Sequence, residues 1–146
     1  MNKETEEKVK IIFPINDEES PIRSERMWAR VIDADNIIFE VKNSPFFVTG
    51  ISYMDQVKAI INEDNEYVFT EVYEKSGHST YHVLLKEGTV DDIRSVMHLG
   101  ATCERGNSTL FALDIAPDID IEPIHKKLIE GVEQGIWDFE ETDMNC

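Results

Sequence analysis

The sequence has few cysteines, no long apolar run and a shortage of basic residues. Its two cysteines, Cys103 and Cys146, belong to no CxxC pair, so neither a disulfide framework nor a zinc site is expected. We expect both thiols to be reduced, with Cys103 as a small buried hydrophobic residue. No stretch approaches the ~18 apolar residues of a membrane-spanning helix, and residues 1–10 lack the apolar segment of a signal peptide. The sequence therefore predicts a cytoplasmic protein without metal, cofactor or membrane anchor.

The charge balance is strongly acidic. Fourteen Lys and Arg stand against 30 Asp and Glu, which gives a formal net charge of −16. Such a surface repels phosphate backbones, which disfavours nucleic-acid binding, and it attracts basic proteins. Simple solubility is the alternative explanation, and it stays open. The acidic residues expected to face a partner lie near the C-terminus: Asp118, Asp120, Glu122, Glu130, Glu133, Asp138, Glu140 and Glu141.

The first half of the chain has the pattern of short β-strands. A length of 146 residues is enough for one domain with a sizeable core. Apolar and polar residues alternate between short polar turns, and a longer polar loop is expected over residues 16–23. This pattern predicts a small antiparallel barrel-like or strongly bent sheet over residues 1–80. The expected strands are 9–13, 27–32, 37–41, 57–61 and 67–73.

The second half alternates strands with two amphipathic helices. Thr89 is expected to cap a helix that ends before Gly100, and Gly135 is expected to end a second helix. The order strand, helix, strand, strand, helix, strand is that of a ferredoxin-like βαββαβ unit. We therefore expect residues 81–146 to form a ferredoxin-like half that packs on the first half as one compact α+β body. The expected elements are strands 80–85, 101–105, 110–115 and 136–140, and helices 90–99 and 120–134.

Residues 71–85 are the stretch around which the chain is organised. Two strand-like runs flank the polar step Ser-Gly-His-Ser, residues 76–79, which predicts a β-hairpin with Gly77 in its turn. The same step holds the chemically capable side chains Ser76, His78 and Ser79. It is therefore the first place to look for an active site.

A hydrolytic interpretation makes His78 a general base for Ser76 or Ser79, oriented by Asp55 or Glu74. No GxSxG sequence or other catalytic signature is present. The favoured alternative is that the serines hydrogen-bond the turn while His78 caps it or pairs with Glu74. The sequence thus leans against an enzyme.

Four segments stand in order between about Arg26 and Glu141: WAR, SPFFVTGISYMDQV, EVYEKSGHSTYHVLL and GIWDFEE. Together they resemble the bacterial domain-of-unknown-function family 4265. Because that family is uncharacterised, the resemblance implies no catalytic role for any position. The positions that belong to the family pattern are Trp28, Arg30, Pro45, Phe46, Phe47, Gly50, Tyr53, Asp55, Ser76, Gly77, His78, Ser79, Thr80 and Trp137.

Two functions of different class remain open. The first is an acidic protein-binding domain, such as an immunity or inhibitor protein that neutralises a basic partner like a nuclease toxin, because complementary charge speeds association. The second is a small-molecule-binding or hydrolytic domain with a pocket between the two halves. Phe46, Phe47, Tyr53 and His78 are the expected wall of that pocket. The sequence does not predict the oligomeric state.

Overall fold

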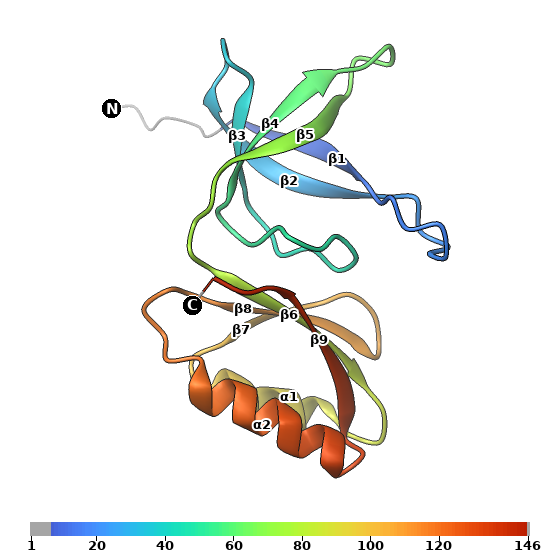
Figure 1. The fold of residues 1–146 in the computed structure, drawn as a ribbon, viewed down its shortest axis with the longest axis vertical. Helices are drawn as coiled ribbons and strands as arrows, with labels where there is room; N and C mark the ends of the chain where they lie inside the picture. Colours follow the sequence, from blue (N-terminus) through green and yellow to red (C-terminus); the bar gives the residue numbers. More distant parts are fainter. Residues whose placement is uncertain (1–6, 146) are drawn as a thin grey trace.

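The computed structural model of the chain describes residues 7–145, so the expectation for Cys146 lies outside the described residues. This part of the chain forms a barrel, a separate sheet and a pair of helices, arranged in that order (Figure 1). The helices among residues 7–145 lack the length and the apolar character of a membrane-spanning segment. The elements are β1 (Lys8–Pro14), β2 (Ser24–Asp33), β3 (Ile38–Val41), β4 (Gln56–Ile61), β5 (Tyr67–Glu74), β6 (Ser79–Leu85), α1 (Val90–Met97), β7 (Thr102–Arg105), β8 (Leu110–Ile115), α2 (Glu122–Glu133) and β9 (Trp137–Asp143).

Strands β1 to β5 close into a barrel in chain order. Neighbouring strands are antiparallel, except that β1 and β5 pair in parallel at Ile11–Tyr67 and Ile12–Val68. Alternation places one side chain in two inside the barrel, as Ile11 and Phe13 show on β1. Residues 8–74 therefore supply the five strands of one of the two sheets. Its buried core consists of Ile11, Phe13, Met27, Ala29, Phe39, Val41, Val48, Ile51, Val57 and Ala59.

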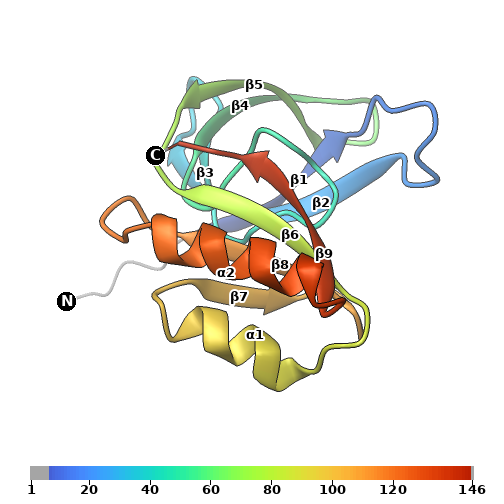
Figure 2. The same cartoon turned by 60° about the horizontal axis from the view of Figure 1, so that its bottom comes forward.

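The remaining strands form an antiparallel sheet in the order β7-β8-β6-β9. Both helices cover the face of this sheet that is turned away from the barrel (Figure 2). The Asp92 carboxylate accepts the Thr89 N–H at the start of α1, and Gly100 and Gly135 take positive φ angles just beyond the two helices. The expected mixed α+β character is confirmed. The buried core here is Tyr81, Val83, Leu85, Ile93, Val96, Ala101, Phe111, Leu113, Ile115, Ile124, Leu128 and Trp137.

The hairpin expected over residues 67–85 is wrong, because β5 and β6 belong to different sheets. Both edges of β5 are taken by β4 and β1, and both edges of β6 are taken by β8 and β9. Gly77 has a φ of +94°, and the space beside its Cα is closed by the Pro117 side chain. The step at residues 75–78, called the joint below, therefore carries the chain from the barrel to the sheet.

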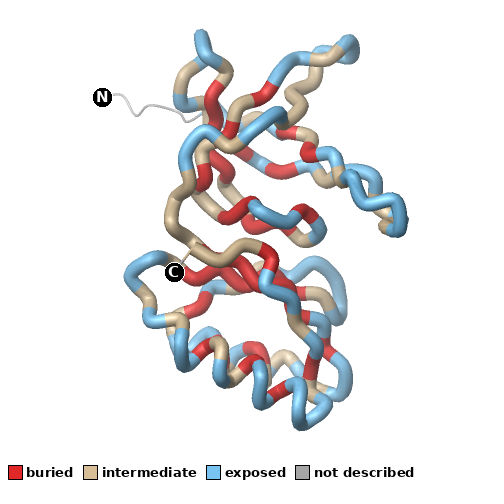
Figure 3. Tube along the Cα trace, viewed as in Figure 1, coloured by how far each residue is buried: buried red, intermediate tan, exposed pale blue. Residues whose placement is uncertain are grey.

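The connection between β3 and β4, residues 42–55, lies between the barrel and the sheet and is called the interface loop below (Figure 1). His82 on β6 hydrogen-bonds the Pro45 carbonyl at 2.7 Å, and the Gly50 N–H donates to the Thr142 carbonyl of β9 at 2.8 Å. Buried residues continue from both cores into this region (Figure 3). The two halves thus meet through directional polar bonds as well as apolar contact.

Candidate functional site

A hollow of about 470 Å³ lies where the interface loop meets the second sheet. It is called the junction hollow below, and its volume falls in the range of about 300–1,000 Å³ that small-molecule sites occupy. Three parts of the chain contribute to it: the interface loop, the joint, and the adjoining ends of β7 and β8. Its lining residues are Lys42, Ser44, Tyr53, His78, Thr102, Glu104, Asp114 and Ala116.

Strand alternation places the polar side chains of β7 and β8 at this hollow. Asp114 and Thr102 are directly opposed in the β7–β8 pair, and Glu104 follows two residues after Thr102 on the same face. Successive side chains alternate between the helix-covered face and the face next to the barrel. The apolar neighbours of these residues therefore enter the helix-covered core while the three polar side chains face the barrel side.

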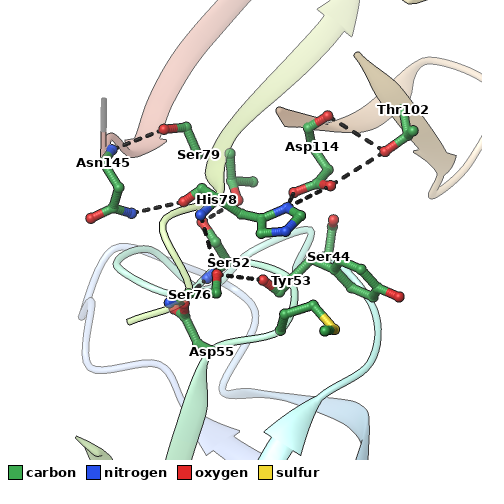
Figure 4. Close-up of polar contacts among 12 residues, drawn as sticks. Ser44, Ser52, Tyr53, Asp55, Ser76, His78, Ser79, Thr102, Asp114 and Asn145 are labelled. Atoms are coloured by element: carbon green, nitrogen blue, oxygen red, sulfur yellow. Dashed lines mark hydrogen bonds and ion pairs between the residues drawn. The ribbon is translucent and has the colours of Figure 1, made fainter. Parts of the chain in front are cut away.

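His78 pairs with Asp114 at the junction hollow (Figure 4). The Nδ1 atom lies 2.9 Å and 3.0 Å from the two carboxylate oxygens of Asp114. An ionised carboxylate only accepts hydrogen bonds, so Nδ1 is the nitrogen that carries a proton toward Asp114, and in the neutral ring Nε2 is left as an acceptor. The Tyr53 ring lies edge-on to the imidazole at 5.4 Å between centroids, so it borders the same space.

The two carboxyl groups of the hollow are held in surroundings that disfavour their charge. Burial raises the pKa of Asp114, although the hydrogen bond and charge of His78 act in the opposite direction. Burial likewise raises the pKa of Glu104, and the hydrogen bond from the Ser44 N–H, 2.7 Å long, partly offsets this effect. Perturbed carboxyl groups that line a concave site are typical of functional sites.

The two serines direct their hydrogen bonds away from the His78 ring. The Ser76 hydroxyl donates to the Tyr53 carbonyl at 2.8 Å and accepts the backbone N–H of His78 at 3.2 Å. The Ser79 hydroxyl accepts the Asn145 N–H at 2.8 Å. Within residues 7–145, no hydrogen bond joins either hydroxyl to the imidazole. Both serines therefore bond the turn and the chain end in this arrangement.

Asp114, rather than Asp55 or Glu74, is the carboxylate bonded to His78. Sequence reasoning missed it because the two residues are 36 positions apart and meet only through pairing of β6 with β8. One signal was available: Asp114 is the single charged residue in the otherwise apolar strand LFALDI. A charged residue in such a strand is expected to have a specific partner.

The four residues expected to form the pocket wall divide into two pairs. Tyr53 and His78 line the junction hollow. Phe46 packs its ring beside Gly106, and Phe47, 44% exposed, lines a different hollow next to β1. The Glu25 carboxylate explains this arrangement, because it accepts the backbone N–H groups of residues 46, 47 and 48 at 2.7, 2.9 and 3.0 Å.

An ionic network fixes the interface loop beneath His78. The Asp55 side chain is completely buried, accepts the N–H groups of Ser52 and Ser76, and pairs with the Lys75 ammonium group. The same ammonium group lies 2.6 Å from Asp143 of β9. The Ser52 hydroxyl also donates to Asp143 at 2.6 Å. The barrel, the joint and the last strand are therefore held together by one cation.

All eight acidic residues expected to face a partner are exposed. Three lie in or just before the first turn of α2, two near its end and three on the edge strand β9. Asp138 pairs with Lys86 at 3.2 Å, so part of this charge is compensated within the chain. Whether these side chains bind a partner remains a prediction.

Cys103 is half-buried against the second core rather than fully buried. Burial raises the pKa of its thiol to about 11, so the thiol stays protonated at neutral pH. In the part of the chain that the structure describes, no three His, Cys, Asp or Glu side chains are placed to hold a metal ion.

Comparisons with known proteins give a family and a fold. The profile of the family described as domain of unknown function (DUF4265) matches residues 25–139, which agrees with the resemblance noted in the sequence. A hypothetical protein from Neisseria gonorrhoeae has a similar crystal structure, with a TM-score of 0.80, 16% sequence identity and 99% of each chain covered. At that identity, the likeness concerns the fold alone. No curated protein matches the sequence.

Replacing Lys75→Met should remove about 2–4 kcal/mol from the free energy of unfolding, since it leaves the buried Asp55 carboxylate without its cation. Urea denaturation measures this loss. Lys126→Met, at an exposed position on α2, is the matched control and should change stability little. A loss below about 1 kcal/mol in the Lys75 variant would show that the network does not hold the halves together.

Replacing Glu104→Gln should raise the melting temperature by a few degrees at neutral pH and have little effect near pH 4. The folded-state pKa of Glu104 lies above its ordinary value of 4.5, so the native state binds more protons than the unfolded state. The stability that the Glu104 carboxyl group contributes is present at low pH and is lost as the pH rises through its folded-state pKa. Glutamine keeps an acceptor for the Ser44 N–H.

Thermal denaturation from pH 4 to pH 8 measures this effect. Glu133→Gln on the exposed side of α2 is the control and should give a curve parallel to that of the unmodified protein. The raised pKa would be contradicted if the Glu104→Gln variant lost stability, compared with the unmodified protein, as the pH rises from acidic to neutral.

Proposed function

The chain belongs to the domain-of-unknown-function family DUF4265, which assigns no activity, and from the geometry of the site we propose that the junction hollow binds a small molecule beside His78. The observation that carries this proposal is the His78–Asp114 pair at the wall of a hollow of about 470 Å³. A concave site with a few convergent polar groups is the usual form of a small-molecule site.

The free hydrogen-bonding capacity of the site supports binding rather than a purely structural pair. The His78 side chain is only 16% exposed, yet its Nε2 atom has no hydrogen-bond partner among residues 7–145. No fully buried side-chain nitrogen or oxygen in that range lacks a partner, so Nε2 keeps some exposure, and its residue lines the hollow. The Tyr53 hydroxyl, at the same wall, likewise makes no hydrogen bond with the described residues.

The pair also suits proton exchange with a bound molecule. Asp114 fixes the imidazole with its proton on Nδ1, so Nε2 can accept a hydrogen bond or a proton from a ligand hydroxyl or a water molecule. Because neither serine hydroxyl is bonded to the ring, any hydrolytic chemistry here would use water rather than Ser76 or Ser79 as the nucleophile.

A small molecule that raises the melting temperature of the protein should lose this effect in the variant His78→Ala. Screening a chemically diverse library by thermal shift identifies such molecules, because a ligand that binds only the native state raises its melting temperature. His98→Ala, at the exposed end of α1, is the matched control and should respond as the unmodified protein does.

Two results would contradict the proposal. One is a ligand that stabilises the His78→Ala variant as strongly as the unmodified protein. The other is a library in which every stabilising ligand leaves the nuclear magnetic resonance signals of His78 unchanged.

We propose, as a second candidate, that the acidic surface of α2 and β9 binds a basic protein, as an immunity or inhibitor protein does. The exposure of all eight acids supports it, since a partner can reach them, and Asp138 would then exchange its pairing with Lys86 for that partner. Complementary charge would raise the association rate and make it salt-dependent. A protein encoded beside this one is the first partner to examine.

Reversing the charges with Glu130→Lys and Glu133→Lys together should weaken binding to such a basic partner about tenfold, mainly through the association rate. Stopped-flow association at two salt concentrations measures this. Asp35→Lys and Glu63→Lys together, both exposed on the barrel, are the control, because they change the net charge by the same amount. Equal weakening by the control and the pair would show that net charge, not this surface, attracts the partner.

We also propose that residues 81–146 are a ferredoxin-like unit and that residues 1–80 are the barrel-like half. The element order β6-α1-β7-β8-α2-β9 supports this, as does the strand order, in which each helix links two strands separated by one antiparallel neighbour. An experimental structure with another strand order would contradict it.

A further inference from the structure

The wall of the junction hollow carries charges of both signs. Lys42 contributes an ammonium group, which lies 3.5 Å from Glu40 and 5.8 Å from the centre of the Tyr53 ring. Glu104 and Asp114 contribute carboxyl groups from the sheet. Acceptors and donors are thus presented to the same space.

This mixture disfavours a ligand with a net charge. An anion would meet two carboxyl groups that burial already destabilises in their charged form. A cation would be attracted by the two carboxyl groups, but it would also meet the Lys42 ammonium group in the same wall. A neutral ligand avoids both repulsions.

Hydroxyl groups match the hydrogen-bond donors and acceptors of this wall. Each hydroxyl can donate one hydrogen bond and accept two, so one kind of group can serve a carboxylate and an ammonium ion alike. Glu104 and the open Nε2 atom of His78 would accept, while Lys42 and the Tyr53 hydroxyl would donate. Hydrogen bonds to charged partners are the stronger ones, so several together can hold a small molecule.

The Tyr53 ring adds an apolar surface to this polar wall. Its edge-on contact with His78, at 78° between planes, places the two rings nearly perpendicular. The negative face of an aromatic ring attracts the weakly positive C–H groups of a saturated ring. Polar groups beside an aromatic ring therefore suit a saturated ring that bears several hydroxyls.

We infer that the junction hollow binds a neutral polyhydroxylated ring of monosaccharide or disaccharide size. Glu104 and His78 accept hydrogen bonds from its hydroxyls, Lys42 donates to its oxygens, and Tyr53 contacts its C–H face. This inference rests on the proposed small-molecule function and specifies the class of ligand.

Titration of the isotope-labelled protein, followed by the side-chain resonances of His78, tests this inference. The probes are three neutral polyols (glucose, ribose and myo-inositol) with maltose, one amine (putrescine) and two anions (citrate and inorganic phosphate). We expect at least one neutral polyol to shift the His78 resonances in a saturable way. Glu104→Gln should weaken that binding at least about fivefold, because a charge-assisted acceptor is lost.

Matched variants separate this result from unfolding. Glu133→Gln should leave the titration unchanged, and the His98 resonances should not move with any probe. Polyol binding that is equally strong in Glu104→Gln would overturn the hydrogen-bonding scheme proposed here.

The remaining outcomes distinguish the inference from the function on which it rests. Saturable shifts of His78 with putrescine, citrate or phosphate, and none with the polyols, would overturn the ligand class but support a binding site. No shift of His78 with any probe, together with no library ligand that depends on His78, would overturn both.

Discussion

The ion pairs of Lys75 hold the barrel against the second sheet, and the rest of the junction depends on them. Lys75 follows the last barrel strand, Asp55 precedes β4 and Asp143 ends β9, so one ammonium group joins segments far apart in the chain. The sheet face beside the barrel carries hydroxyl, imidazole and carboxyl groups rather than a continuous apolar layer. Directional bonds therefore set the position of the two halves, and the junction hollow lies beside them.

The same polar junction carries a cost in stability. Burial opposes the charged forms of Glu104 and Asp114, and the fold keeps both groups at the hollow. If these two positions served only the stability of the fold, neutral side chains would stabilise it more, as they do on the helix-covered face of the same sheet. Sites that hold destabilised polar groups in a concave surface are the places where proteins give up stability for function. This reasoning links the electrostatics of the hollow to the proposed binding.

Local patterns in the sequence predict most of the elements but not their pairing. Alternation identified the barrel strands, and Thr89, Gly100 and Gly135 marked the helix ends. The hairpin over residues 67–85 was wrong because closure of the barrel by β1, more than 50 residues earlier, competes for the edge of β5. The candidate site divides in the same way: His78 was found from the sequence, whereas its partner Asp114 depends on the pairing of β6 with β8.

The tautomer of His78 tests the central claim most directly. Long-range proton–nitrogen correlation spectra, recorded at a pH where the imidazole is neutral, show which ring nitrogen carries the proton. We expect the proton on Nδ1, held by Asp114, with Nε2 unprotonated and responsive to molecules that enter the hollow. A proton on Nε2 would mean that Asp114 does not orient the ring, and it would contradict the site described for the junction hollow.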